Sequence, residues 1–257
     1  MAAHLILGFA AGLLIAAFTS PVGVSGAVFM LPFQLSILAV ANPAVTPTNL
    51  LYNVVAGPGA LLRYRRNGQL TGPLARLLIA GTAPGVVIGA VVRVLLLPGP
   101  RAFRVVAGLV LLALGAWLIA HTLRPPQARQ PLSNPSIQAL AFVVGIVGGV
   151  YGIGGGSILS PILVGSGMAV AVVAPAALAA TFVTSIIGSL AFAVLSQFAH
   201  GSIAPDWPIG VACGLGGLAG GYVGALAQPR LPERSLRLLL AVVALGLGAV
   251  YLIQGLV

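Results

Sequence analysis

Two glycine clusters interrupt apolar segments of the chain, and their residue types and spacing suit the binding of an anion. Gly152-Ile153-Gly154-Gly155-Gly156-Ser157 is followed by Pro161, and Gly23-Val24-Ser25-Gly26-Ala27-Val28 is followed by Pro32. Glycine costs roughly 1 kcal/mol against alanine in a helix interior, so clustered glycines predict an unwound turn. A helix that restarts after such a turn presents free backbone N–H groups and the positive end of its dipole, which together bind anions. The predicted anion-binding residues are Gly23, Ser25, Gly26, Gly152, Gly154, Gly155, Gly156 and Ser157.

Close packing of helices is the other explanation for glycines in such segments, because small residues let two backbones approach. It is the better explanation for the two triplets Gly81/Gly85/Gly89 and Gly216/Gly220/Gly224, whose spacing of four places each triplet on one helix face. For the two clusters the choice between packing and anion binding stays open. A nucleotide-binding loop is excluded, because no Lys-Ser/Thr pair follows residues 152–156.

Several polar residues lie inside apolar runs and are candidates to line a cavity with the clusters. Asn49 and Asn53 are four apart, on one helix face, and Tyr52 lies between them. A buried amide needs a hydrogen-bond partner, so bonding between helices is the alternative to lining a cavity. The predicted substrate-binding side chains are Gln34, Asn49, Tyr52, Asn53, Thr181, Thr184 and Ser185.

Ionisable groups are few, and none of them forms a catalytic or metal-binding arrangement. Asp206 and Glu233 are the only acids, and both stand beside a proline at the end of an apolar run, so no carboxylate proton relay is visible. His200 suits an interfacial anchor, and Arg93 could extend its charged end toward the membrane surface or contact a substrate. Cys213 is the only cysteine. We therefore expect neither an enzyme nor a cofactor nor a bound metal.

The composition is that of an integral membrane protein. The chain is 59% hydrophobic and 5% charged, whereas soluble domains carry about 25% charged residues. The net charge of +10 comes from arginines that are scattered singly between apolar runs, which argues against nucleic-acid binding. The arginines are instead expected to set the orientation of the chain in the bilayer.

The chain is predicted to be an all-α, polytopic membrane protein with about eight hydrophobic segments. Six runs are long enough to cross a bilayer, at about 46–62, 77–97, 103–121, 172–198, 208–228 and 236–254. Two further segments, about 5–40 and 137–166, contain the glycine clusters. A polar, proline-rich linker at 123–135 separates a first transmembrane repeat, 1–122, from a second, 136–257.

The two halves match each other, which predicts an internal duplication. Pro161 corresponds to Pro32 at an offset of 129, and Gly216 to Gly81 at an offset of 135. Each half is a four-element repeat, a glycine-broken or re-entrant segment followed by three spans. At an intermediate offset of 132, Asn49 and Asn53 correspond to Thr181 and Ser185, so the candidate residues form two related sets.

The relative orientation of the two repeats depends on whether each broken segment crosses the membrane or returns to the side it entered from. The arginines favour inverted repeats, because that arrangement gathers most of them on one side of the membrane. Parallel repeats, in which each broken segment crosses once, stay open.

Together these features resemble the TauE/SafE family, also called the sulfite exporter or toluene-sulfonate uptake permease family. The residues that carry the resemblance are the run from Gly152 to Pro161, the small-residue run from Ala176 to Thr181, the turn at Gly201, and the two-fold repeat. The resemblance covers nearly the whole chain. It implies a multi-pass protein of the bacterial inner membrane that transports small sulfur-containing anions such as sulfite, thiosulfate, sulfonates or sulfoacetate.

We therefore expect a secondary transporter that works by alternating access, with its anion at the glycine-broken helices near the middle of the membrane. An anion channel, or passive facilitator, built on the same site is the alternative. The expected partners are the anion and the lipid bilayer, with no nucleic acid. A homodimer and a coupling proton or sodium ion are left open.

Overall fold

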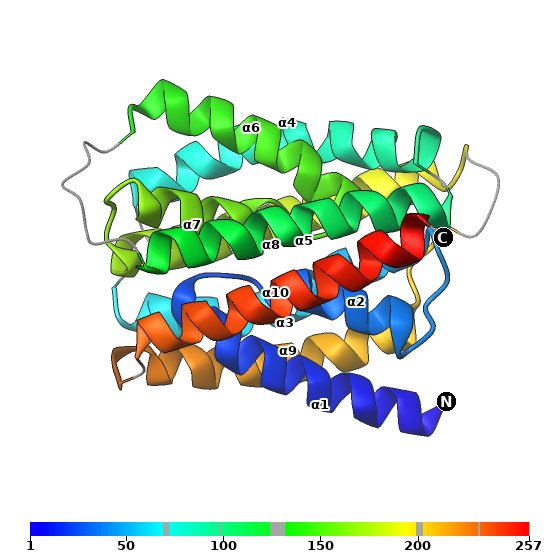
Figure 1. Cartoon of the computed structure of the whole chain (residues 1–257), viewed down its shortest axis with the longest axis horizontal. Coiled ribbons are helices and arrows are strands. Elements are labelled where there is room, and N and C mark those ends of the chain that lie inside the picture. The colour runs from blue at the N-terminus through cyan, green and yellow to red at the C-terminus, as the bar shows by residue number, and fades with distance from the viewer. Residues whose placement is uncertain (69–71, 98, 124–131, 199–202, 231, 257) are drawn as a thin grey trace.

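The structure, a computed structural model, describes residues 1–68, 72–97, 99–123, 132–198, 203–230 and 232–256, and every regular element in these ranges is helical. The long helices lie side by side with their axes roughly aligned (Figure 1). They are α1 (Ala2–Thr19), η1 (Ser20–Val22), α2 (Ala27–Ser36), α3 (Val45–Arg66), α4 (Pro73–Leu95), α5 (Pro100–Leu123), α6 (Asn134–Tyr151), α7 (Gly156–Gly165), α8 (Val170–Leu195), α9 (Trp207–Ala227), η2 (Gln228–Arg230) and α10 (Glu233–Leu256). The predicted all-α class is confirmed.

Within the described residues, seven helical segments are long and apolar enough to cross a membrane. They include α1 and α6, the helices that precede the two glycine clusters. They do not include α3, although the sequence predicts a span at about 46–62. The reason is that α3 carries uncharged polar residues along its length and three arginines in its last turn, which lower its hydropathy. Its 22 residues nevertheless extend about 33 Å, the thickness of a bilayer core.

The glycine clusters interrupt the helices at the predicted places. In the first half, Gly23 has a φ of +73° and α2 begins four residues later, at Ala27. In the second half, Gly152, Gly154 and Gly155 have φ values of +79°, +72° and +83°, and α7 begins at Gly156. Glycine reaches this left-handed region without the steric cost that a Cβ imposes, so the clusters end one helix and re-aim the chain into the next.

Helix packing is symmetric when the first five helices are exchanged for the last five. The packing of α1 on α9 corresponds to that of α6 on α4, and α3 on α9 corresponds to α8 on α4. The pairs α3–α8 and α5–α10 correspond to themselves. The interfaces of the bundle therefore have the pattern that two related halves would produce.

Corresponding helices of the two halves run in opposite directions. In the α3–α8 pair, Gly57 lies against Phe182 and Gly188 against Leu50. In the α5–α10 pair, Gly108 lies against Leu252 and Gly115 against Leu245, so residue numbers rise along one helix as they fall along the other. Figure 1 shows the same opposition between α1 and α6.

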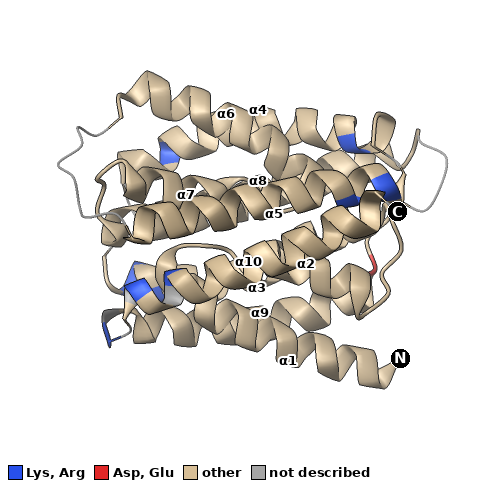
Figure 2. Cartoon of the chain, in the orientation of Figure 1, with Lys and Arg blue, Asp and Glu red and all other residues tan. Residues whose placement is uncertain are grey.

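Most of the arginines in the described residues lie at one end of the bundle, at the left in Figure 2. Four helix termini meet there: the last turn of α3, the first turn of α4, η2 and the first turn of α10. The arginines of these termini are Arg63, Arg65, Arg66, Arg76, Arg230, Arg234 and Arg237. The opposite end carries Arg93, Arg101 and Arg104. Arg124, Arg129, His200 and the Gly201 turn lie outside the described residues.

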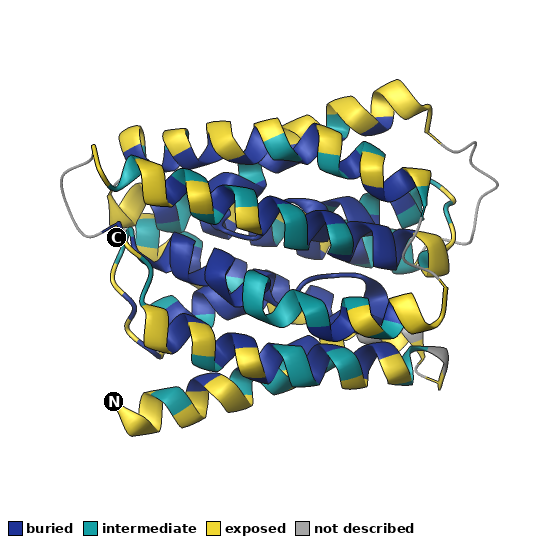
Figure 3. Ribbon diagram, turned by 180° about the vertical axis from the view of Figure 1, so that it is seen from behind, coloured by how far each residue is buried: buried dark blue, intermediate teal, exposed yellow. Residues whose placement is uncertain are grey.

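The outer surface of the bundle exposes many large hydrophobic residues. Leu14, Leu190, Val223 and Ile253 are among the large hydrophobic residues with more than half of their surface exposed. In Figure 3 the buried residues line the interior, and exposed ones alternate along the outside of each long helix. Soluble proteins rarely expose so much contiguous apolar surface to water, so this surface contacts lipid, as expected for a multi-pass membrane protein.

Candidate functional site

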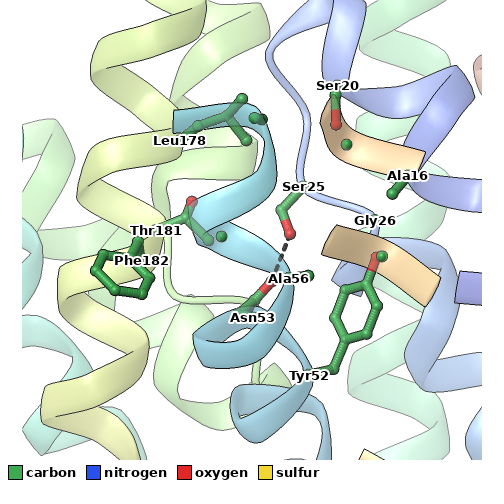
Figure 4. A pocket seen from close by; sticks show the side chains of 14 residues that line it. Ala16, Ser20, Ser25, Gly26, Tyr52, Asn53, Ala56, Leu178, Thr181 and Phe182 are labelled. Carbon is green, nitrogen blue, oxygen red and sulfur yellow. Dashed lines mark hydrogen bonds between the residues drawn. The ribbon is translucent and has the colours of Figure 1, made fainter. Parts of the chain in front are cut away.

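A small cavity lies beside the break after α1, between the first broken segment and helices α3, α8 and α9 (Figure 4). Its volume is about 30 Å³, measured as the space open to the centre of a water molecule, and about 10–15 Å³ of such space holds one water. The residues that line it are Ala16, Ser20, Ser25, Gly26, Tyr52, Asn53, Ala56, Gly57, Ala60, Leu178, Thr181, Phe182, Gly217 and Gly221. The cavity therefore has room for a ligand of only a few atoms.

Ser25 is held at the rim of this cavity by three hydrogen bonds. Its Oγ donates to Asn53 Oδ1 at 2.5 Å and accepts from the backbone N–H of Ala27 at 3.2 Å. Its own backbone N–H donates to Ser157 Oγ, in the other half of the chain, at 3.1 Å. The backbone donors of Ser25 and Ala27 are thus already used.

Three lining side chains carry buried donor groups without a hydrogen-bond partner: Tyr52 Oη, Asn53 Nδ2 and Thr181 Oγ1. Tyr52 is 1% exposed, and Asn53 and Thr181 are each 3% exposed. A buried polar group that lacks a partner costs about 1–3 kcal/mol. Because all three groups can donate and they come from α3 and α8, the cavity suits a ligand that accepts hydrogen bonds.

The described lining contains no ionisable acid or base apart from the Tyr52 phenol. Its remaining walls are mostly apolar, formed by alanines, glycines, Leu178 and Phe182, with the hydroxyls of Ser20 and Ser25 beside them. The first arginine on α3 beyond Asn53 is Arg63, ten residues further along, or about 15 Å at 1.5 Å per residue. The site is therefore a neutral set of donors in apolar surroundings, without a carboxylate to repel an anion.

Asn49 joins the two broken segments to each other. Its Nδ2 donates to the carbonyl oxygen of Ala27 at 2.9 Å and to that of Gly152 at 3.0 Å. Two further bonds cross between these segments, from Tyr151 Oη to Val28 O at 3.2 Å and from Ser160 Oγ to Val22 O at 3.2 Å. The two broken segments are consequently joined by hydrogen bonds. The cavity lies beside the first of them, at Ser25 and Gly26.

The second glycine cluster packs tightly on α8. Thr184 Oγ1 donates to the carbonyl oxygens of Gly154 and Ala180. A Cβ added at Gly154 would lie 2.7 Å from Ser185 Oγ, and one added at Gly156 would lie 2.5 Å from Thr181 Oγ1. The absence of a Cβ at these glycines therefore allows α7 and the turn before it to approach α8 closely.

Comparison with known proteins identifies the family of the chain. The family model described as sulfite exporter TauE/SafE matches residues 7–251, nearly the whole chain. The chain belongs to the TauE/SafE family. A probable membrane transporter protein, YunE of Bacillus subtilis (strain 168), is 25% identical over 275 aligned positions, which cover 95% of this chain and 96% of that protein. The chain is therefore a multi-pass membrane transporter, and the bacterial relative agrees with the expected inner-membrane location.

In this TauE/SafE protein, the cavity brings together five of the residues predicted from sequence: Ser25, Gly26, Tyr52, Asn53 and Thr181. The remaining predicted residues lie elsewhere in the same network or away from it. They are Gly23, Gln34, Asn49, Gly152, Gly154, Gly155, Gly156, Ser157, Thr184 and Ser185. Their part in binding stays a prediction.

Two of these residues lie apart for visible reasons. Gly23 faces Ala174 and Ser160, because a Cβ added there would lie within 2.7 Å of both. Gln34 lies further along α2, beside the Cys213 thiol, and is fully buried. The short helix α2 carries Gln34 away from the break at which the cavity lies.

Some lining residues of the TauE/SafE cavity were not predicted from sequence. Gly217 and Gly221 each directly follow a glycine of the packing triplet on α9. They form a second glycine-lined face of this helix, next to the face that the triplet forms. The doubled glycines at 216–217 and 220–221 are the signal that could have revealed that face. Ala16, Ala56 and Ala60 offer no comparable signal, because alanine is common throughout these helices.

Arg93 corrects the expectation that its side chain extends to the membrane surface. It is fully buried, and its Nε donates to Thr46 Oγ1 at 3.1 Å while its other nitrogens donate to Asn42 Oδ1 and Leu97 O. Its guanidinium carbon lies 4.2 Å from the centre of the Phe103 ring. The loop oxygens and the aromatic face supply contacts that water would otherwise provide, so Arg93 ties α4 to the start of α3.

Proposed function

We propose that this membrane transporter carries small sulfur-containing anions, of the sulfite, thiosulfate, sulfonate or sulfoacetate class, as a secondary transporter. The observation that carries the proposal is the buried trio of unpartnered donors, Tyr52 Oη, Asn53 Nδ2 and Thr181 Oγ1, around one cavity. Donors without a nearby carboxylate favour an anion. The sulfur chemistry rests on membership of a family described by sulfite export.

The proposed mechanism is alternating access by two inverted repeats. The support is that corresponding helices pack in matching pairs and run in opposite directions. The cavity is lined from both halves, by Asn53 of α3 and Thr181 of α8, so a movement of one half against the other would open it. Such inverted repeats with broken helices at the substrate site are a recurring transporter design.

The arginine-rich end supports an orientation for this process. Cytoplasmic loops of membrane proteins are enriched in Lys and Arg, so this end is proposed to face the cytoplasm. Along α3 the cavity extends from Asn53 past Ala56 to Ala60, toward the end that carries Arg63. Positive charge at that end of the bundle would raise the local concentration of anions there.

Transport by purified protein in liposomes tests the proposal. Tyr52→Phe and Thr181→Val each remove one unpartnered hydroxyl and keep the shape of the side chain. Because a hydrogen bond to a charged group contributes about 1.5–3 kcal/mol, each change should weaken sulfite binding about tenfold or more. Uptake of radiolabelled sulfite against concentration measures this effect.

Matched controls keep that test specific. Tyr222→Phe removes a tyrosine hydroxyl that accepts a bond from Arg66 at the cytoplasm-facing end, and Thr122→Val removes an unpartnered threonine hydroxyl at the end of α5. Neither residue lines the cavity, and both variants should transport like the parent protein. Equal effects of site and control variants would refute the proposed site.

An anion channel on the same site is the second candidate, favoured by the absence of a carboxylate within the described spans. Counterflow separates the two functions: a carrier loaded with unlabelled sulfite drives transient accumulation of labelled sulfite. A channel would show no such accumulation and would instead give unitary currents in a planar bilayer.

A further inference from the structure

The donors that face the cavity are all electrically neutral. Asn53 Nδ2 is an amide, and Tyr52 Oη and Thr181 Oγ1 are hydroxyls. Asn53 cannot swing its amide freely, because its Oδ1 accepts the 2.5 Å hydrogen bond from Ser25 Oγ. The orientation of the Nδ2 donor is thereby set before a ligand arrives.

No arginine lines the cavity in the part of the chain that the structure describes. Arg63, on the same helix as Asn53, stands at the cytoplasm-facing end, ten residues further on. Arg93 is buried, but its three donor nitrogens already bind Thr46, Asn42 and Leu97. An anion in the cavity is therefore stabilised by dipoles and hydrogen bonds, without a paired cation.

Such a site discriminates strongly by charge. The cost of moving an ion from water into an apolar environment rises with the square of its charge, so a dianion costs about four times as much as a monoanion. The hydrogen bonds from three neutral donors increase only about in proportion to the charge. A second negative charge therefore adds more desolvation cost than these donors can offset.

The size of the cavity points the same way. It measures about 30 Å³, and Phe182 and Leu178 form apolar walls beside Thr181. This space suits a compact oxyanion better than an anion with an organic tail, which would have to displace these side chains.

We infer that the site selects the singly charged, protonated form of sulfite, hydrogen sulfite, over the dianions sulfite, sulfate and thiosulfate. This inference rests on the proposed function and narrows it to one species. The substrate then brings its own proton across the membrane, on one of its atoms, and no carboxylate of the protein needs to carry one. A proton that travels on the substrate explains why the protein needs no acid in the middle of a span. Its only two acids, Asp206 and Glu233, lie at the starts of α9 and α10.

Equilibrium exchange in liposomes, with the same pH on both sides, tests this inference without a proton gradient. Total sulfite is held constant and below saturation while the pH is raised from one unit below to one unit above the second pKa of sulfurous acid. Over this range of two pH units the hydrogen sulfite fraction falls about tenfold in total, and the exchange rate should fall with it. Sulfate, a dianion throughout, should not exchange, whereas methanesulfonate, a monoanion throughout, should show exchange or competition that is independent of pH.

Two results would overturn the inference: sulfite exchange that is constant or rises with pH, and sulfate exchange as fast as that of sulfite. Failure of every sulfur anion to exchange or compete at any pH would instead overturn the proposed function, and this inference with it. Thermal unfolding at each pH separates loss of transport from loss of structure.

A charge-insertion pair gives an independent readout. Ala56→Lys places an ammonium group in the cavity wall, whereas Leu62→Lys places one on the same helix at a side chain that is 49% exposed. Ala56→Lys should bring sulfate exchange up at least tenfold relative to hydrogen sulfite, and Leu62→Lys should leave the ratio unchanged. If Ala56→Lys does not fold, the pH profile of the parent protein decides the question by itself.

Discussion

At the scale of single residues, Asn49 and Asn53 lie one helical turn apart on α3 but make different contacts. Asn53 faces the cavity, with its oxygen bound to Ser25 and its nitrogen unpartnered. Asn49 uses its nitrogen to bind Ala27 O and Gly152 O, one carbonyl from each broken segment. On α3, Asn53 is thus a candidate to bind the ligand, whereas Asn49 holds the two broken segments together.

Asn49→Leu tests the structural role of this side chain. Leucine has a similar volume but leaves the carbonyls of Ala27 and Gly152 without their shared donor, and each buried unpaired group costs about 1–3 kcal/mol. We expect a clearly lower midpoint of thermal unfolding in detergent. Asn67→Leu, at an exposed position just after α3, is the control and should unfold near the parent temperature. An unchanged midpoint for Asn49→Leu would show that the two breaks do not depend on its amide.

The candidate site could be predicted in part, because a polar side chain in an apolar run needs a specific partner. That reasoning selected Tyr52, Asn53 and Thr181, and the structure places all three at the cavity. It could not separate the role of Asn49 from that of Asn53. The spacing of four places both on the same helix face, but it does not show which backbone carbonyls lie within hydrogen-bonding distance of either side chain. It also could not foresee that the hydroxyls of Ser157 and Ser25 occupy the backbone donors of Ser25 and Ala27.

At the scale of helices, glycine has two separate uses in this protein. In the clusters it supplies positive φ angles, as at Gly152 and Gly155, and redirects the chain. In the triplets it removes side chains where α9 meets α1 and where α4 meets α6, since a Cβ at Gly224 or Gly81 would meet backbone atoms of the partner helix. The packing role predicted for the triplets is confirmed, and it explains how these helices approach so closely.

Substitution of two helical glycines by alanine separates packing from helix propensity. A Cβ at Gly220 would press on the backbone of Leu13 in α1, whereas one at Gly246 in α10 would meet nothing within 4 Å. Gly220→Ala should therefore lower stability by about 1–3 kcal/mol, and Gly246→Ala should raise it by about 0.5–1 kcal/mol. Unfolding in detergent, followed by circular dichroism, measures both. Shifts of the same sign would contradict the packing argument.

Helix positions could be predicted from hydropathy because lipid-facing and core-facing residues are both apolar here. The exception is α3, whose hydropathy is lowered by Asn49, Asn53 and the arginines of its last turn. Its polar residues are tolerated because they face the interior, with Asn49 and Asn53 both at most 3% exposed. The helix that contributes most to the site is thus the one that composition identifies least well.

At the scale of the whole molecule, the direction of the helices and the distribution of charge lead to one topology. Arginines crowd the end at which α3 and α9 finish and α4 and α10 begin, and that end is proposed to be cytoplasmic. The first residue of α1 and the last turn of α10 lie at the other end (Figure 2). Each half therefore begins at one end of the bundle and finishes at the opposite end.

Single cysteines placed after two corresponding helices decide between inverted and parallel repeats. Arg66 ends α3, and Ala204, which is exposed, lies between α8 and α9. In a Cys213→Ala background, which removes the one native thiol, Arg66→Cys and Ala204→Cys each carry one label site. Because α3 and α8 run antiparallel, a membrane-impermeant thiol reagent added to intact cells should label position 204 and not position 66. Disruption of the membrane should then expose position 66 as well. Labelling of both positions from the same side would require α3 and α8 to cross in the same direction, which the pairing of Gly57 with Phe182 and of Gly188 with Leu50 does not allow.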